Sequence, residues 1–376
     1  MGDKGRSIVV GAGIVGLAMA RSMAMRGFQV TVVEKGQTAQ GASVRNFGMV
    51  WPIAQAHGYL YDRAIRSREI WKSICQSAGI WYEQSGSLAV SYLGEETAVL
   101  EEFYEDEHPF RSLALLNPKE VLEKCPAVNP AGLLKGLYSG EEMIVDPREA
   151  IAKIPLYLKE QWEVNFVFGK TAVEVREQKV ILADGQVLEA DQIIICPGAD
   201  LETLFPEQFH SNPLTNCKLQ MMRLEAQPKG WRMGPALFAG LSLTHYNSFL
   251  QTSSAQALQT YFEAAYPDHV KWGIHVMVSQ NGVGELTVGD SHEYGRSHDP
   301  FDKAFINGLI LEYMSRFARF PTERIIATWH GYYPKMTDGS PDLILEPLPG
   351  VLIINGVGGA GMTYSFGLAE EICSAW

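Results

Sequence analysis

Six residues near the start of the chain have the types and spacing needed to hold a phosphorylated cofactor: Gly11-Ala12-Gly13-Ile14-Val15-Gly16. Gly11 allows a tight turn, Gly13 leaves the backbone bare for a pyrophosphate, and Gly16 lets a following helix pack closely. The pyrophosphate would meet a helix N-terminus, where unpaired N–H groups and the helix dipole favour negative charge. The stretch predicts a dinucleotide site; a glycine-rich turn in an ordinary α/β domain is the alternative.

The residues around this turn predict the elements that would position it. Residues 8–10 predict a short buried strand, residues 17–26 a helix that Gly27 ends, and residues 30–33 a second strand. Glu34 closes that strand 18 residues beyond Gly16, where its carboxylate could accept hydrogen bonds from an adenosine ribose. An acid at this position argues against a 2′-phosphate, so NAD or FAD is favoured over NADP.

A second glycine-rich junction lies near the end of the chain. Residues 351–354 predict a buried strand, residues 356–363 are rich in glycine, and residues 364–373 predict a helix. Two such junctions suit a ligand too long for one of them, and the terminal helix could stabilise negative charge on a reduced ring system. The loop at 42–52 mixes Arg, Asn, Phe, Met and Trp, which suits a flat, partly polar ligand; a loop under a hydrophobic lid is the alternative.

The middle of the chain predicts a second sheet. Residues 171–196 are typical of a meander ending in a buried strand, which stops at Pro197-Gly198 and indicates a return to the first sheet. Alternation predicts long antiparallel strands at residues 219–224, 246–250, 272–278 and 286–289. Residues 301–320 predict a helix and residues 329–342 a loop. The predicted fold class is α/β (α+β overall), a Rossmann-like dinucleotide domain with an antiparallel-sheet second domain.

The composition limits the partners and the compartment. A chain of 376 residues with 46% hydrophobic and 20% charged residues suggests an ordinary globular protein of two domains. The net charge of −12 argues against nucleic acid and anionic membrane as partners. The five cysteines have no metal-like or paired spacing, so we expect reduced thiols, no metal site and a cytoplasmic location. No apolar run approaches the ~20 residues of a membrane span, and the run after Lys4 and Arg6 is too short for a signal peptide.

Five motifs along the whole chain carry a family resemblance. They are Gly11-x-Gly13-x-x-Gly16 with Glu34, Ala-Ser-x-Arg-Asn-x-Gly at 42–48, Pro197-Gly198-Ala199, Gly331-x-x-Pro334-x-x-x-Asp338-Gly339-x-Pro341, and Gly356 through Thr363. In these motifs the chain resembles the flavin-dependent amine and amino-acid oxidoreductases that include D-amino-acid oxidase, glycine oxidase and monomeric sarcosine oxidase. The resemblance implies FAD as the dinucleotide, in a discontinuous domain. It implies FAD-binding segments at 1–85, 146–215 and 326–376, with substrate-domain segments at 86–145 and 216–325.

The resemblance also assigns cofactor contacts. The first glycine turn with Glu34 and Lys35 would hold the ADP part, the 43–48 loop would line the pyrophosphate and the flavin, and the second glycine junction would meet the pyrimidine edge of the flavin. The implied cofactor-binding residues are Gly11, Ala12, Gly13, Ile14, Val15, Gly16, Glu34, Lys35, Ser43, Arg45, Asn46, Phe47, Gly48, Val173, Pro197, Gly198, Gly331, Gly358, Gly359, Ala360, Gly361, Met362 and Thr363.

Two departures from the family pattern bear on the chemistry. Sarcosine oxidase-like members carry a flavin-linking cysteine after the glycine that corresponds to Gly331; this chain has none there, so we expect noncovalent FAD. Glycine oxidase-like members place an arginine just before the proline of that segment to grip the substrate carboxylate, and this chain has Tyr333. The missing bidentate grip argues against a plain α-amino acid.

A narrower resemblance points to another anion. The runs Val-Arg-Asn-Phe-Gly-Met-Val-Trp-Pro, Lys-Leu-Gln-Met-Met-Arg, Gly-Asp-Ser-His-Glu-Tyr and Tyr-Tyr-Pro-Lys-Met-Thr-Asp-Gly resemble the subgroup associated with aminophosphonate catabolism. A tetrahedral phosphonate suits a cluster of basic and hydroxyl groups better than one planar fork. The candidate catalytic or substrate-contacting residues are His292, Tyr332, Tyr333, Lys335 and Arg223, with His245 and Gln55 as further candidates. Each has a purely structural role as its alternative.

The implied reaction is oxidation of a carbon–nitrogen bond in a small anionic amine, such as an N-methylated 2-aminoethylphosphonate. The amine would give a hydride to flavin N5, and water would hydrolyse the resulting imine; no side chain is assigned as a base. One alternative is a glycine, sarcosine or D-amino-acid oxidase or dehydrogenase. Others are a non-catalytic FAD-binding module and an NAD-linked dehydrogenase. The electron acceptor, oxygen or another, is left open.

Overall fold

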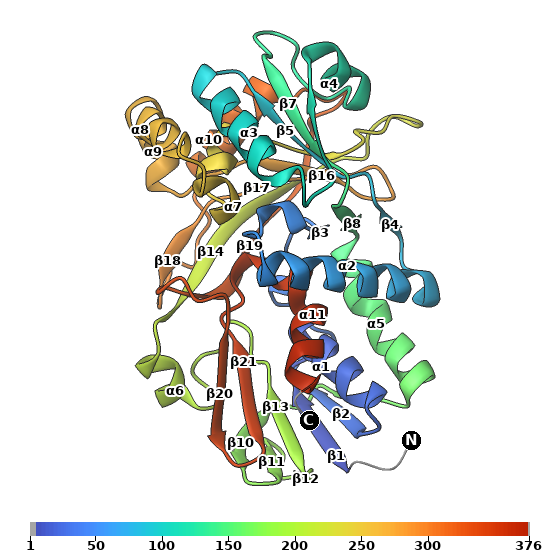
Figure 1. Ribbon diagram of the computed structural model, residues 1–376. Helices are drawn as coiled ribbons and strands as arrows, with labels where there is room; N and C mark the ends of the chain where they lie inside the picture. Colours follow the sequence, from blue (N-terminus) through green and yellow to red (C-terminus); the bar gives the residue numbers. More distant parts are fainter. Residues whose placement is uncertain (1–4, 375–376) are drawn as a thin grey trace.

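The computed structural model describes residues 5–374, which form two large sheets with helices packed around them (Figure 1). The first sheet has the strand order β20-β21-β13-β1-β2-β9. Its strands are β1 (Arg6–Val10), β2 (Gln29–Glu34), β9 (Asn165–Phe168), β13 (Gln192–Ile195), β20 (Leu343–Leu348) and β21 (Val351–Asn355). All neighbours pair in parallel except β20, which runs antiparallel to β21. This is the predicted Rossmann-like sheet.

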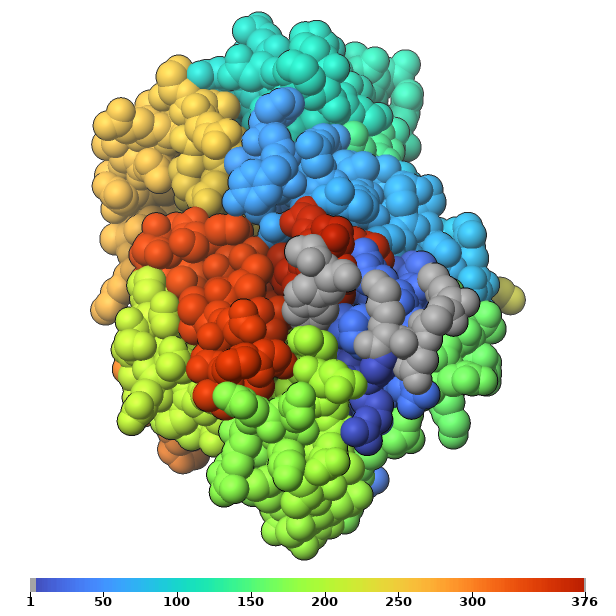
Figure 2. All heavy atoms as spheres, turned by 60° about the horizontal axis from the view of Figure 1, so that its bottom comes forward, coloured from blue at the N-terminus to red at the C-terminus, as the bar shows by residue number. Residues whose placement is uncertain are grey.

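This sheet collects strands from three distant parts of the chain. Figure 2 shows blue N-terminal, green central and red C-terminal residues meeting on one face. Its helices are α1 (Ile14–Met25), α2 (Tyr59–Ala78), α5 (Pro147–Trp162) and α11 (Gly361–Ser374). α1 and α11 lie side by side, and both pack with α2 or α5 into one apolar cluster. Asp146 caps α5, because its Oδ1 accepts the N–H of Arg148 (3.0 Å).

The second sheet contains nine strands and is mostly antiparallel. Its order is β18-β14-β17-β16-β15-β5-β7-β6, with β19 on the free side of β14. The strands are β5 (Ser87–Ser91), β6 (Leu113–Leu116), β7 (Lys135–Ser139), β14 (Leu214–Leu224), β15 (Ala236–Ala239), β16 (Met277–Gln280), β17 (Leu286–Gly289), β18 (Glu293–Gly295) and β19 (Ile325–Met336). The helices of this part are α3 (Gly94–Glu107), α4 (Pro118–Lys124), α7 (Asn247–Leu250), α8 (Ala255–Ala265), α9 (Pro267–Lys271) and α10 (Ala304–Phe317). The predicted mixed α/β architecture is therefore confirmed.

Smaller elements accompany the two large sheets. The predicted meander is β10 (Ala172–Arg176), β11 (Lys179–Leu182) and β12 (Val187–Glu189), and α6 (Pro206–Ser211) follows the first sheet. A short sheet joins β3 (Met49–Val50), β8 (Met143–Val145) and β4 (Tyr82–Glu83). Four 3₁₀ turns lie at Ala42–Val44, Pro52–Ala54, Gly240–Thr244 and Gly358–Ala360. Within residues 5–374, no helix is long and apolar enough to cross a membrane. The segment boundaries assigned above to the two domains stay a prediction.

Three predicted elements were wrong. The predicted strand at 246–250 is α7, and most of 272–278 precedes β16, which begins at Met277. The predicted loop at 329–342 is largely β19, which pairs with β14 from Leu214↔Met336 to Leu224↔Ile325. Pro334 is accommodated because β19 has its ladder on the β14 side, and on its other side the described residues form an isolated bridge, Lys335 to Val357; such an edge strand tolerates proline.

Candidate active site

One continuous cavity of about 840 Å³ joins both glycine-rich junctions to the second sheet. Gly11 and Glu34 line one end, Gly359 lies on the wall of the middle, and Leu219 of β14 and Tyr333 of β19 line the other end. Its size is that of a site for a cofactor and a small substrate. The two halves of this cavity are built by different means.

The first glycine turn is fixed by close backbone contacts. Gly11 has φ +102°, and a Cβ there would lie 2.3 Å from the carbonyl oxygen of Cys196. A Cβ on Gly16 would lie 1.9 Å from the carbonyl oxygen of Gly11. Neither position can carry a side chain without moving backbone atoms. The start of α1 is therefore held against the cavity with room for a bulky anion beside its N-terminus.

Polar groups at this end are oriented by the backbone. The Glu34 carboxylate accepts the N–H groups of Ala12 and Gly36, both at 2.9 Å, and lines the cavity where β2 ends. Ser43 Oγ accepts the N–H of Ile14 (2.9 Å) at the first turn of α1. These contacts keep a carboxylate and a hydroxyl at the cavity wall, which fits the ribose and phosphate groups of a dinucleotide.

The second glycine junction and the 42–52 loop hold each other in place. The N–H of Trp51 donates to Thr363 Oγ1 (3.1 Å), and Trp71 Nε1 donates to the carbonyl of Met362 (2.8 Å). Arg45 donates to the carbonyl of His330 (3.1 Å), and Asn46 Oδ1 accepts the N–H of Gly48 (2.7 Å). Both segments line the middle of the cavity, where a flat ring system could lie between the two sheets.

Most of the predicted cofactor residues lie around this one cavity, and three do not. Ala12 is buried behind the turn, Gly48 approaches the carbonyl of Val145, and Val173 is 44% exposed while its neighbour Ala172 lines the cavity. Successive strand residues point to opposite faces, so the Val173 side chain points away from the cavity that Ala172 lines, and its contact with the cofactor stays a prediction. The residues that line the cavity are Gly11, Gly13, Ile14, Val15, Gly16, Glu34, Lys35, Ser43, Arg45, Asn46, Phe47, Pro197, Gly198, Gly331, Gly358, Gly359, Ala360, Gly361, Met362 and Thr363. Their individual contacts with a cofactor stay predictions.

Of the predicted substrate residues, all but one line the cavity. His292, Tyr332, Tyr333 and Lys335 line the cavity, together with the further candidates His245 and Gln55. Arg223 is outside it, which corrects its prediction as a substrate contact: its guanidinium donates to Glu285 (2.9 Å) and lies 5.5 Å from the ring of Trp329. Arg223 shares a strand face with Leu219 and Met221, but it lies beyond the end of the cavity.

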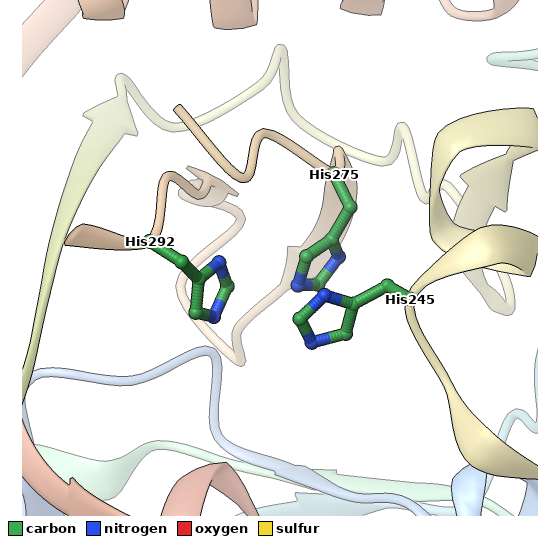
Figure 3. A group of neighbouring side chains, drawn as sticks. All are labelled: His245, His275 and His292. Atoms are coloured by element: carbon green, nitrogen blue, oxygen red, sulfur yellow. The ribbon is translucent and has the colours of Figure 1, made fainter. Parts of the chain in front are cut away.

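The substrate half contains a stack of three histidines, His245, His275 and His292, hereafter the histidine stack (Figure 3). The ring centroids of His245 and His275 are 3.8 Å apart, those of His245 and His292 4.7 Å, and those of His275 and His292 5.0 Å. The rings come from three separate segments, following the 3₁₀ turn at 240–244, before β16 and after β17. Their interplanar angles are 27°, 38° and 20°, so the ring planes are roughly aligned and the three rings form a compact triangular cluster.

Burial governs the charges of this cluster. Loss of hydration lowers the pKa of His292 to about 4, and it also lowers the pKa values of His245 and His275. Lys335 adds to these decreases in pKa, because a nearby positive charge disfavours a second one. Burial raises the pKa of Asp290, whose Oδ1 lies 3.2 Å from His275 Nε2. The three histidines are therefore neutral near pH 7.

The residue patterns did not reveal His275 and Asp290 as site residues. His275 lies in an apolar run that resembled core strand, and Asp290 lies in the Gly-Asp-Ser-His run that singled out His292. Their proximity depends on the antiparallel pairing of β16 with β17, which brings segments on either side of a turn together. The backbone confirms this, because His275 and Asp290 exchange N–H···O bonds of 3.2 and 2.9 Å.

The comparison with protein families decides which cofactor this cavity serves. The model of the DAO family, described as FAD dependent oxidoreductase, matches residues 6–375. The chain belongs to this FAD-dependent oxidoreductase family. FAD is thus the cofactor, and the two glycine junctions, the Glu34 carboxylate and the open middle of the cavity fit its ADP and ring parts. Noncovalent attachment stays a prediction.

Individual relatives of this oxidoreductase are distant. The tRNA 5-methylaminomethyl-2-thiouridine biosynthesis bifunctional protein MnmC of Pseudomonas savastanoi pv. phaseolicola is 26% identical over 237 residues, covering 60% of this chain. The match spans about a third (34%) of that relative's length. Among solved structures, L-proline dehydrogenase from P. horikoshii has a TM-score of 0.77 at 20% identity and covers 100% of this chain and 93% of that one. Glycine oxidase from Geobacillus kaustophilus has a TM-score of 0.76 at 18% identity, covering 99% and 94%. These structures share the fold.

Proposed function

We propose that this FAD-dependent oxidoreductase oxidises the carbon–nitrogen bond of a small anionic amine, and that the amine is an aminophosphonate such as an N-methylated 2-aminoethylphosphonate. The observation that carries the proposal is the chemistry of the cavity's substrate half. Lys335 lines it without a carboxylate partner among residues 5–374, and hydroxyl and imidazole groups surround it. Such a set of separate donors suits a tetrahedral anion.

Bound FAD supplies the hydride acceptor, and the chain's own residues prepare the substrate. Lys335, with Tyr333 and His292 beside it, binds the anionic head. Leu219, Met221 and Met277 form an apolar wall of the same cavity. Low polarity and the Lys335 charge both disfavour a protonated amine. The substrate therefore binds with a neutral nitrogen, whose lone pair assists loss of hydride from the adjacent carbon.

A carboxylate substrate is the second candidate, supported by the fold shared with glycine oxidase and L-proline dehydrogenase. Tyr333 is the observation against it. Its ring occupies the position at which glycine oxidase-like members carry an arginine, and it is 8% exposed. No cation takes that place on the same strand except Lys335, whose single ammonium gives no planar fork.

The test is anaerobic mixing of the flavin-loaded protein with 2-aminoethylphosphonate, its N-methyl derivative, glycine, sarcosine and D-alanine. The expected result is loss of the oxidised-flavin absorbance with a phosphonate and little change with the carboxylates. Reduction by the carboxylates alone would replace the aminophosphonate with an amino acid. A flavin that none of them reduces would overturn the assignment to amine oxidation.

A further inference from the structure

The histidine stack has unused hydrogen-bonding capacity that faces the cavity. Among residues 5–374, the ring nitrogens of His245 and the Nε2 of His292 have no hydrogen-bond partner, whereas His292 Nδ1 is 2.9 Å from the carbonyl of Gly273. The ligand atoms of the three rings lie within 4.8 Å of one another. Asp290 Oδ1 is buried beside them and makes no hydrogen bond of good geometry in the described chain. Buried polar groups normally have partners, so this cluster indicates a ligand.

The arrangement of the rings bears on the kind of ligand. Their centroids form a triangle with sides of 3.8, 4.7 and 5.0 Å, and their ligand atoms lie within 4.8 Å of one another. Imidazoles placed in this way present several N–H edges side by side. This arrangement suits an anion with several oxygens, each of which accepts one hydrogen bond.

The charges around the histidine stack favour an anion as well. The groups that face it are Lys335 and Tyr333 of β19, Tyr246 after the 3₁₀ turn, Asp290 after β17 and Tyr294 of β18. Lys335 supplies a positive field, and the hydroxyl groups can donate. Asp290 is the carboxyl group in contact with the stack, and burial raises its pKa, which favours its protonated form; a protonated carboxyl group can itself donate to an anion.

An anion would change the protonation of this cluster. Without one, burial and repulsion by the Lys335 ammonium disfavour a positive charge on the imidazoles. A bound dianion offsets that repulsion and stabilises an imidazolium, which has two N–H donors instead of one. Because binding of anion and proton then favour each other reciprocally, the affinity for the anion rises as pH falls.

We propose that His245, His275 and His292 form a proton-coupled subsite for a tetrahedral oxyanion, in which the histidine stack takes up about one proton as the anion binds. This inference rests on the proposed function for its substrate, since a phosphonate is such an anion. The proton comes from solvent and stays on the imidazoles, and no covalent bond changes. The coupling selects a doubly charged tetrahedral head over a singly charged carboxylate.

Sulfate is the probe that tests the coupling, because it remains a tetrahedral dianion between pH 6 and 8 and carries no exchangeable proton of its own. The flavin-loaded protein is titrated with sulfate by calorimetry at pH 7.0 in two buffers of different ionisation enthalpy, which gives the number of protons taken up. We expect uptake approaching about one proton per sulfate and a Kd that rises by up to about tenfold per pH unit between pH 6 and 8. Acetate should bind more weakly and take up fewer protons.

Variants test whether the histidine stack is the source of the proton uptake. His245→Gln and His275→Gln should each weaken sulfate binding and reduce the proton uptake, whereas His108→Gln, an exposed histidine outside the cavity, should change neither. Sulfate that binds without proton exchange, fails to bind, or binds equally well to all variants would overturn the proposal. The proton count on the unmodified protein decides it even if a variant loses its flavin.

The outcome is separable from that of the proposed function. Proton-coupled sulfate binding with no flavin reduction by any amine would leave the subsite standing and remove the aminophosphonate oxidation. Flavin reduction by an aminophosphonate with no proton uptake on sulfate binding would support the aminophosphonate oxidation and overturn the proton-coupled subsite.

Discussion

The two halves of the cavity differ in what specifies them. In the cofactor half the decisive atoms belong to the backbone: Gly11 and Gly16 matter because no Cβ fits there, and the Glu34 carboxylate is held by two N–H groups. In the substrate half the decisive atoms are side chains brought from separate segments of the chain. Backbone requirements leave a local pattern of glycines in the sequence, whereas a cluster of side chains leaves none. The comparison predicts different responses to substitution.

The largest effect is expected in the cofactor half. Gly16→Ala should abolish flavin binding or folding, because the new methyl group would lie 1.9 Å from the carbonyl oxygen of Gly11 and only backbone movement could relieve it. The flavin content and the thermal unfolding of the purified protein measure this. Gly308→Ala is the matched control: it lies in α10 with nothing within 4 Å of the new Cβ, and should stabilise the protein by about 0.5–1 kcal/mol. A Gly16→Ala protein with full flavin content would contradict the backbone argument.

The second effect concerns pH and the substrate half. The folded-state pKa of His292, about 4, is below the ordinary value of 6.5, so the unfolded chain binds more protons between these values. Stability is therefore fully present above pH 6.5 and decreases as pH falls toward 4, by about 3 kcal/mol for this group alone. Urea unfolding at pH 7.5 and pH 5.0 measures the decrease, and His292→Gln should reduce it. An unchanged pH dependence in the variant would show that the ring is not held neutral.

Lys335 tests the electrostatics of the substrate half directly. Lys335→Met should raise KM for an aminophosphonate about 10- to 100-fold, because the anionic head loses its cation, while flavin content stays normal. Lys229→Met, which removes an exposed lysine outside the cavity, is the control and should leave KM unchanged. A KM unaffected by Lys335→Met would place the anion elsewhere.

The smallest effect is expected at Arg223, a cation that the sequence pattern grouped with Lys335. Arg223→Met should lower the free energy of unfolding by about 1–2 kcal/mol through loss of its buried contact with Glu285, which keeps Arg148 as a partner. KM for the amine should not change. Arg176→Met, which breaks an exposed pair with Glu174, should cost little stability. An increase in KM on substitution of Arg223 would restore it to the site.

The same contrast explains how far the sequence predicts this protein. Strand, glycine turn, helix and acid lie within residues 8–34. This local pattern was therefore enough to predict the central strands of the first sheet and the cofactor-binding turn. His275 and Asp290 meet only because β16 pairs with β17 in one register, and Arg223 misses the cavity because it lies two residues past Met221 on β14. Register and distance along a strand are properties of the folded sheets, and a propensity pattern does not contain them.

We propose that this oxidoreductase selects its amine by a tetrahedral anionic head. A direct test compares N-methyl-2-aminoethylphosphonate with N-methyl-β-alanine, which have the same amine and the same two-carbon spacer and differ only in the anion. Anaerobic stopped-flow reduction of the bound flavin by each gives a limiting rate and an apparent Kd. The phosphonate should reduce the flavin with a ratio of rate to Kd at least about 100-fold higher, a difference of about 2.7 kcal/mol. Equal or faster reduction by the carboxylate would contradict the claim.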